Sequence, residues 1–439
     1  MDSAKLIKRL LFAGVLLAMS IPMILTAYPF VEIDPLEGSF EEVEKPAFSW
    51  DSVYTGGYQK AMEAYINENT GGRPYLVRIN NQLDFWLFNK ANAAGVLIGK
   101  EGFLYEESYI DSYYGSDFVG DDVVHEKMRK LQRVADTLQE RGTELVVVFA
   151  PGKGSFYPEY FPGHLRQKQK RTNYLAYLEA IEKTDVHFMD FRAWFLAMKE
   201  DSKYPLFPKG GIHWSSYGEV LAADSMIQYM NSITKESQIN RIKIDQVNPS
   251  KYAYNMDEDI EESMNLLFNL EDLEMGYPVF GPVEHSAART TKVLTVADSY
   301  FWGMYNWGLA TEYFNNGEYW YYNREMYPQS FTKLTFVQNL VDLTYEVEKN
   351  DVVMILFTDA NLKDFAYDFI DRLYEEYCED GRVKRERKIQ KLMQDIRNTP
   401  DWLAKIEKQA KDEGISLEEA LRKNAVYMMV QEEKKSLEK

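Results

Sequence analysis

The chain has few of the residues that build disulfides or bind phosphate. It contains one cysteine, Cys378, among 439 residues, so an intrachain disulfide is excluded. Basic residues are in the minority, because 69 Asp and Glu face 50 Lys and Arg and the formal net charge is -19. Phosphate contacts need clustered Lys and Arg, so we expect no nucleic-acid partner. The same charge disfavours a strongly anionic polymer as substrate unless a local basic patch overrides it.

Metal-binding patterns are also missing from the sequence. His, Cys and Asp residues do not cluster at the spacing of metal ligands, so we expect no metal and no other cofactor. The chain also contains no internal repeat and no low-complexity tract. These absences leave an ordinary globular protein whose chemistry must come from its own side chains.

One long uncharged stretch lies near the N-terminus. Lys5, Lys8 and Arg9 precede the uncharged stretch from Leu10 to Tyr28, which is long enough to span the ~30 Å hydrocarbon core of a bilayer. The basic flank predicts residues 1–30 as a single-pass anchor in the inner (cytoplasmic) membrane, with the following domain in the periplasm or outside the cell. A cleaved signal peptide ending near Ala27 is the alternative interpretation. No cysteine lies directly after this stretch to carry a lipid.

The body of the chain alternates between strand and helix patterns. An acidic, Pro-containing linker over residues 31–57 leads into two helical patterns between Tyr58 and Asn92. Continuous apolar runs bounded by Gly or Pro then predict buried parallel strands. The expected strands are 144–150, 186–190, 292–297 and 352–357, and the expected helices are 122–141, 172–183, 217–231, 337–349 and 362–377. This alternation predicts a three-layer α/β domain over residues 58–380, with ligands at the carboxyl ends of the strands.

The C-terminal segment, residues 381–439, differs from the body in its high charge. Thr399-Pro400 is a helix-start signal, and Ser416-Leu-Glu-Glu419 matches a capping box. We expect two or three small helices here that either dock on the α/β domain or bind a partner.

Two segments carry the chemistry. The strand at 292–297 delivers Asp298-Ser299 at its carboxyl end, and a Gly-rich loop carries His213-Trp214. A serine at a strand end and a histidine on a distant loop are the minimum for serine acyl transfer. Ser299 lacks a Gly-x-Ser-x-Gly elbow, so a helix N-cap is its alternative role. His285 is a weaker rival for the base.

The order of these motifs resembles a known group. Phe149-Ala-Pro-Gly-Lys153 lies upstream of the His213-Trp214 pair, and Asp298-Ser299 follows both. Over roughly residues 58–375 the chain resembles the AlgX/AlgJ-like SGNH-hydrolase superfamily, exported proteins associated with O-acetylation of exopolysaccharides. The resemblance implies that Ser299 forms the acyl-enzyme and that His213 is its base.

Two departures from that pattern affect the expected site. The glycine of a Gly-Asp-Ser motif is Ala297 here, and the acid of an Asp-x-His-Trp motif is Gly211. Losing the acid that orients the histidine can cost a serine enzyme about four orders of magnitude. Three interpretations remain open: another acid such as Asp359 reaches His213, a Ser–His dyad suffices, or catalysis has been lost.

The sequence therefore predicts an O-acetyltransferase acting on a cell-surface or exported polysaccharide. Ser299 and His213 are the expected catalytic residues, and the expected supporting residues are Asp298, Asp359, Trp214 and Lys153. The resemblance implies a membrane-bound O-acyltransferase partner that brings acetyl groups across the membrane. A carbohydrate acetyl esterase and a catalytically impaired assembly or glycan-binding component are the alternatives.

Overall fold

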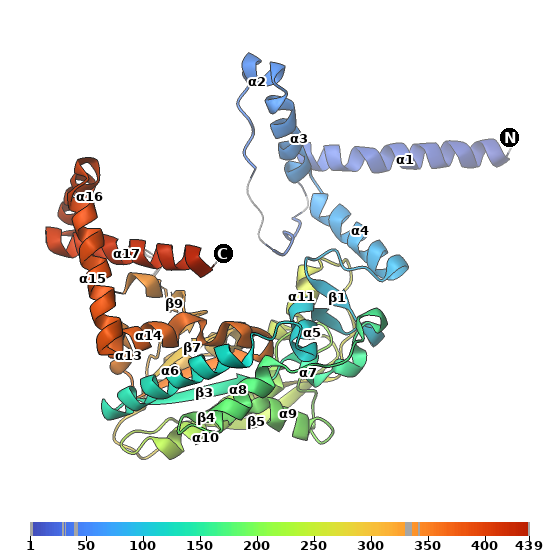
Figure 1. The fold of residues 1–439 in the computed structure, drawn as a ribbon. Coiled ribbons are helices and arrows are strands. Elements are labelled where there is room, and N and C mark those ends of the chain that lie inside the picture. The colour runs from blue at the N-terminus through green and yellow to red at the C-terminus, as the bar shows by residue number, and fades with distance from the viewer. Residues whose placement is uncertain are drawn as a thin grey trace.

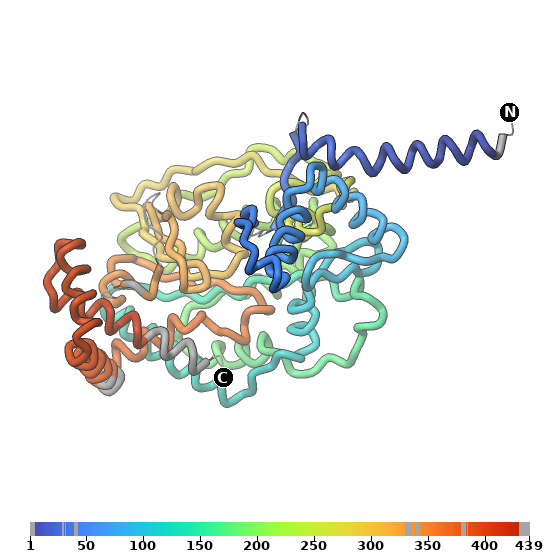
Figure 2. The backbone as a smooth tube through the Cα atoms, turned by 90° about the horizontal axis from the view of Figure 1, so that it is seen from above, coloured from blue at the N-terminus to red at the C-terminus, as the bar shows by residue number. Residues whose placement is uncertain are grey.

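The computed structural model describes residues 3–28, 30, 32–38, 43–329, 336–340 and 343–437. Residues 31 and 39–42 of the predicted linker, and residues 341–342 of the helix predicted over 337–349, lie outside this part of the chain. The apolar helix α1 (Ser3–Ala27) projects from one side of the α/β body, and the C-terminal helices lie on the other side (Figures 1 and 2).

A six-stranded sheet forms the centre of the body, in the order β4-β3-β10-β7-β8-β9. The first five strands are parallel and β9 pairs antiparallel with β8. Their bounds are β3 Glu144–Ala150, β4 His187–Asp190, β7 Val293–Ala297, β8 Tyr319–Tyr321, β9 Glu325–Tyr327 and β10 Val352–Thr358. Every residue of β7 and β10 is buried, which explains why these strands read as unbroken apolar runs.

Successive side chains of the strands enter two separate cores. On β3, Val146 and Val148 pack in one core, whereas Val147 and Phe149 pack in the other. The first core is covered by α9 (Phe191–Met198), α10 (Ser216–Ile233) and α12 (Trp302–Asn306). The second is covered by α6 (Asp121–Glu140), α8 (Asn173–Ile181), α13 (Leu343–Glu348) and α14 (Phe369–Tyr377). The predicted three-layer α/β architecture with a mostly parallel sheet is confirmed.

Several elements were not predicted or have different bounds. The predicted helix 362–377 is wrong at its start, because η8 (Asp359–Asp368) occupies that part and includes Ala366 and Tyr367 at positive φ. The helix predicted over 337–349 is divided in the described residues between η7 (Val337–Asn339) and α13. The antiparallel pair β5 (Arg241–Ser250) and β6 (Met275–Val283) was missed.

The N-terminal region consists mostly of short helices before the sheet begins. They are α2 Trp50–Tyr54, α3 Gly57–Asn69, α4 Arg73–Phe88 and α5 Glu107–Tyr114, and the antiparallel pair β1 Val96–Ile98 and β2 Leu104–Glu106 lies between α4 and α5. Past β3 the chain forms the one-turn helix α7 (Lys153–Phe156), and α11 (Asp259–Ser263) lies in the segment between β5 and β6. The connections that contain α7 and α11 border the carboxyl end of the sheet.

Three helices follow the body, as expected of residues 381–439. They are α15 Glu379–Arg397, α16 Pro400–Glu413 and α17 Leu417–Leu437, and they share an apolar core of their own that includes Ile396 and Leu421. The capping box is formed, because Glu419 N–H donates to Ser416 Oγ and Ser416 N–H donates to Glu419 Oε2. The C-terminal helical extension predicted from sequence is confirmed.

Candidate active site

Ser299 stands where β7 ends and the short helix η5 (Ser299–Phe301) begins. The capping residue of η5 is Asp298, whose carboxylate accepts the N–H of Tyr300 at 3.1 Å. The same carboxylate accepts the Thr358 N–H at 2.7 Å and the Asn361 amide at 2.9 Å, which ties the end of β7 to the end of β10. Burial raises the pKa of Asp298 despite these donors. Ser299 is therefore held on rigid elements while its side chain remains partly exposed.

His213 lies directly opposite Ser299. Its Nε2 is 2.9 Å from Ser299 Oγ, a hydrogen-bond distance. The neighbouring Trp214 is fully buried and donates its indole N–H to the Tyr300 carbonyl at 3.1 Å, so it anchors the histidine loop to η5. The two residues that the sequence selected are brought together, although 86 positions separate them.

The acid beside His213 is Asp259, the first residue of α11. Its Oδ2 lies 2.5 Å from His213 Nδ1, and its Oδ1 accepts the Ile212 N–H at 2.8 Å. One carboxylate thus binds both the imidazole and the backbone next to it. Serine hydroxyl, imidazole and carboxylate form a continuous relay with the geometry of a catalytic triad.

The packing around Gly211 explains why the acid comes from another segment. A Cβ added at Gly211 would lie 2.8 Å from the Met256 carbonyl and 2.7 Å from the Asp257 carbonyl. The backbone of residues 256–257 therefore occupies the space that a side chain at 211 would need. This close approach also brings Asp259 to the imidazole. Asp259 was not predicted from the sequence, because it lies neither next to the histidine nor at a strand end.

The charge of Asp259 sets the protonation of the base. Burial alone would lower the pKa of His213, but the charge and hydrogen bond of Asp259 outweigh burial, and the pKa of His213 is raised above its usual value. Glu106 at the end of β2 adds to this effect through its own negative charge. The Asp259 bond also favours the tautomer that leaves Nε2 free to accept the Ser299 proton.

The prediction that Asp359 reaches His213 is wrong. The Asp359 carboxylate accepts the Ser155 hydroxyl and lies 3.8 Å from Arg192 Nε. Asp359 starts η8 at the end of β10, where it is buried, and burial raises its pKa. It therefore packs against the loop after β3 instead of contacting the histidine.

Lys153 holds the loop that carries His213 through hydrogen bonds to the loop backbone. Its ammonium is buried and donates to the carbonyls of Lys209 and Gly211, each at 2.7 Å. Burial lowers the pKa of Lys153 to about 7. Asp272 holds the same loop by accepting the N–H groups of Lys209 and Gly210 at 2.8 Å and 3.1 Å. The loop that presents His213 is thus fixed through its backbone.

A tyrosine that the sequence did not single out also lies beside the nucleophile. The Tyr322 hydroxyl is near the side chains of Ser299 and Asn361, and burial raises the pKa of Tyr322. Tyr322 follows β8 with φ at 48°, a conformation that bulky residues rarely adopt, and its N–H donates to the Ala297 carbonyl at 2.8 Å. No sequence motif marks this position.

Aromatic side chains lie on the segments that follow Ser299 in the sequence. Trp302, on the turn after Ser299, packs edge-on against Tyr321 and Tyr327, with ring centroids 5.3 Å and 4.7 Å apart. These rings are partly exposed. Partly exposed aromatic rings beside a nucleophile suit a substrate with apolar ring faces, such as a sugar.

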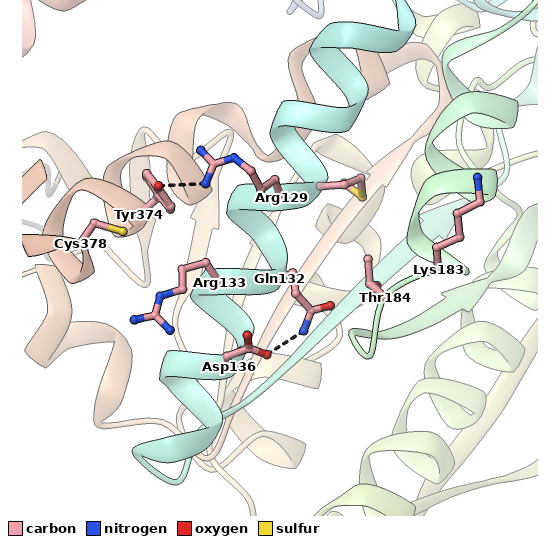
Figure 3. A pocket seen from close by; sticks show the side chains of 9 residues that line it. Arg129, Gln132, Arg133, Asp136, Lys183, Thr184, Tyr374 and Cys378 are labelled. Carbon is pink, nitrogen blue, oxygen red and sulfur yellow. Dashed lines mark hydrogen bonds between the residues drawn. The ribbon is translucent and has the colours of Figure 1, made fainter. Parts of the chain in front are cut away.

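A separate groove lies away from this relay, between α6, α14 and the end of α8. It has a volume of about 570 Å³ and includes Arg129, Tyr374 and Cys378 (Figure 3). Arg129 donates to the Tyr374 hydroxyl at 3.0 Å across the groove. Neither Ser299 nor His213 lines it, so the candidate active site is identified by its side-chain geometry instead of by this cavity.

Comparisons with known proteins agree with the resemblance seen in the sequence. Residues 96–261 match the model of the SGNH hydrolase-like domain of the acetyltransferase AlgX. "Probable alginate O-acetylase AlgJ" of Pseudomonas syringae pv. tomato is 25% identical over 175 residues, 40% of this chain and 43% of that protein. The protein of the same name from Pseudomonas putida is 23% identical over 189 residues, 43% of this chain and 46% of that protein. The solved O-acetyltransferase domain of Pseudomonas putida AlgJ has a TM-score of 0.41 and 16% identity, covering 64% of this chain and 99% of that one.

The matches cover only part of each protein. The chain spans less than half the length of the curated relatives that it matches. The family match includes His213 and Asp259, and Ser299 follows it in the sequence. Within these bounds the resemblance predicted from the sequence is confirmed: through residues 96–261 the chain is similar to the AlgX/AlgJ-like SGNH-hydrolase proteins.

Proposed function

We propose that this chain is a serine-dependent O-acyltransferase that places acetyl groups on the hydroxyls of an exported or cell-surface polysaccharide. The observation that carries the proposal is the relay from Ser299 Oγ through His213 to Asp259, with heavy-atom distances of 2.9 Å and 2.5 Å. Similarity to the AlgX domain model and to the AlgJ proteins supports acetyl transfer as the reaction.

In the first half-reaction Ser299 takes the acetyl group. His213 Nε2 accepts the Ser299 proton as Oγ bonds to the acyl carbon of the donor, and Asp259 stabilises the imidazolium that forms. His213 then gives this proton to the departing oxygen of the donor as the bond from that oxygen to the acyl carbon breaks. The product is an ester on Ser299 and a released donor alcohol.

In the second half-reaction a sugar hydroxyl replaces the donor. His213 Nε2 accepts the hydroxyl proton while the sugar oxygen bonds to the acyl carbon, and the proton returns to Ser299 Oγ as the serine ester breaks. Water in place of the sugar would give the esterase reaction with the same residues. The partition between the two depends on how well the acceptor is held beside Ser299.

Two groups are suited to stabilise the oxyanion formed in each half-reaction. The Ser299 N–H stands at the first position of η5, where no preceding helical turn supplies an acceptor. The Tyr322 hydroxyl lies near the Ser299 side chain and is the second candidate donor. Removing one such donor typically lowers kcat by a factor of about 10²–10³.

The rings beside the site support a proposal for the acceptor, and the N-terminal helix supports one for the cellular setting. The partly exposed rings of Trp302, Tyr321 and Tyr327 are the surface on which we propose that the polysaccharide lies. The apolar segment Lys5–Ala27 is long and apolar enough to cross a membrane. We propose that it is an uncleaved inner-membrane anchor, that the α/β body lies on the outer side, and that a membrane-bound acyltransferase partner supplies the acetyl group.

The proposal is tested by measuring acetate release and acetyl transfer in parallel. The purified chain is incubated with an activated acetyl ester, with and without a neutral oligosaccharide acceptor. Wild type should acetylate the acceptor, and Ser299→Ala and His213→Ala should not. Acetate release that depends on Ser299 without transfer to any acceptor would support the esterase instead. Equal, slow turnover by wild type and Ser299→Ala would contradict both catalytic functions and favour an assembly or glycan-binding role.

A further inference from the structure

Helix α4 places two of its polar side chains inward. Asn81 and Gln82 are 6% and 2% exposed, respectively. Asn81 donates its amide to the Met264 carbonyl at 2.9 Å, and the Gln82 carbonyl oxygen accepts the Phe268 N–H at 3.0 Å. The side of α4 that faces the body is therefore held by hydrogen bonds to the segment that follows α11.

The outward side of α4 is apolar. Its exposed residues, which we name the α4 apolar face, are Tyr75, Leu76, Ile79, Leu83, Trp86, Leu87 and Phe88. Asn80 is the only other exposed residue of this helix. Trp86 and Leu87 are 60% and 68% exposed, and Trp86 stacks on the exposed ring of Phe268 at 5.8 Å. A contiguous exposed apolar stripe of this kind marks an interaction surface, because contact between apolar side chains and water is unfavourable and a binding partner removes it.

The charges of α4 are kept away from this face. Arg73 pairs with Glu68 at 2.9 Å, and Arg78 donates to the backbone carbonyls of Asp34 and Pro35. A protein-binding surface normally has a polar rim around its apolar centre. A row of Leu, Ile and Phe with Tyr75 near one end and Trp86 near the other matches a helix that lies at the headgroup–acyl boundary of a bilayer.

The start of α4 contacts the end of α1. The Gly71 N–H, two residues before α4, donates to Thr26 Oγ1 at 2.7 Å. A Cβ at Gly71 would lie 2.3 Å from Thr26 N, so the approach of the two segments requires glycine. The end of the apolar helix at which the chain would leave a membrane is therefore the place where α4 begins (Figure 1).

We propose that α4 is a second membrane contact, which lies flat on the lipid surface that α1 enters and buries the α4 apolar face among the lipid headgroups and upper acyl chains. This inference rests on the proposed anchoring of α1. Because the segment held by Asn81 and Gln82 follows directly on α11, which carries Asp259, the contact keeps the candidate active site close to the membrane from which the acetyl group is proposed to come.

Spin-label accessibility in phosphatidylcholine vesicles tests this contact on the full chain. In a Cys378→Ser background, a nitroxide is attached at Leu83→Cys or at Leu87→Cys. The matched control is Leu175→Cys on α8, which is 42% exposed in the body. Collision of each label with oxygen, which concentrates in lipid, is compared with collision with a water-soluble nickel chelate. The labels at 83 and 87 should show an oxygen-to-nickel ratio at least several-fold higher than the label at 175.

A fourth label at Leu16→Cys, in the middle of α1, separates the two proposals. Lipid exposure at 16, 83 and 87 supports the inference. Lipid exposure at 16 with water exposure at 83 and 87 contradicts it while leaving the anchor intact. Labels at 83 and 87 that are shielded from both reagents indicate protein contact, which also overturns the lipid assignment. Water exposure at 16 contradicts the anchor, and the inference fails with it.

Discussion

Asp259 Oδ2 lies 2.5 Å from His213 Nδ1, although 46 positions separate the two residues in the chain. In the resembling family an acid two residues before the histidine is expected in this role, and this chain has Gly211 there. The backbone of residues 256–257 packs over Gly211 and positions Asp259 for the same contact. The absent acid is thus no reason to regard the site as impaired.

Asp259→Asn should reduce kcat strongly while leaving the fold intact. The amide can keep the contact with the imidazole but stabilises the wrong tautomer and cannot balance the imidazolium charge, so a loss of about 10⁴ in kcat is expected. Ester turnover by the purified variant measures this. The matched control is Glu262→Gln, an exposed acid on the same helix, which should keep wild-type turnover.

The residual activity of Asp259→Asn should also have a different pH dependence. Asp259 raises the pKa of His213, and the base works only when neutral, so kcat/KM of wild type falls as the pH drops through that raised pKa. Removing the charge lowers the pKa of His213, and the acid limb of the kcat/KM profile should shift to lower pH. An acid limb at the same pH in both proteins would show that another group controls it.

Returning the acid to position 211 should fail. In Gly211→Asp the new Cβ would lie 2.7 Å from the Asp257 carbonyl, so the 256–257 backbone must shift. Overpacking of this kind costs about 1–3 kcal/mol of folding free energy. Gly211→Asp should lower the melting temperature, and the double variant with Asp259→Asn should be no more active than Asp259→Asn alone. Recovery of activity in the double variant would contradict the packing argument.

Tyr322→Phe should lower kcat by about 10², because it removes a hydroxyl donor beside the reacting oxygen. The loss should fall on kcat for both the donor ester and the transfer step, with little change in melting temperature. Tyr321→Phe is the matched control, one residue away on β8, with its ring tilted against that of Tyr322 at a centroid distance of 4.5 Å. If both variants retain wild-type kcat, Tyr322 does not stabilise the transition state.

Because Glu219 on α10 is buried, we expect the free energy of unfolding to fall as the pH rises. Burial raises the pKa of Glu219 from 4.5 to about 8, although Trp307 donates to its carboxylate. Between these values the folded chain keeps a proton that the unfolded chain has lost, so the free energy of unfolding falls by up to about 1.4 kcal/mol per pH unit. Urea unfolding of Glu219→Gln should lack this component of the slope. The exposed Glu407→Gln should keep the wild-type slope.

The sheet and the serine–histidine pair could be predicted because both depend on local patterns. Unbroken apolar runs such as Val293–Ala297 must be buried on both faces, and the residues that follow such strands meet at one edge of the sheet. Ser299 and the histidine loop could therefore be selected before their distance was known.

The remaining site residues depend on contacts that no local pattern reveals. Asp259 reaches His213 because a polar segment far from the loop packs on Gly211, and Tyr322, which lies near Ser299, has an unusual backbone conformation. The apolar spacing of Leu76, Ile79, Leu83 and Leu87 predicted a helix correctly. That spacing gives no sign that the apolar side faces outward and that Asn81 and Gln82 face the body.

Trapping the acyl-enzyme shows whether Ser299 carries the acyl group. The full chain is mixed with an activated acetyl ester, quenched in acid within the first turnover, digested and analysed by peptide mass spectrometry. In wild type the peptide containing Ser299 should carry one acetyl group, and in Ser299→Ala or His213→Ala that peptide should carry none. Acetylation at another residue, or turnover without any acetyl-enzyme in an acid-quenched time course, would contradict it.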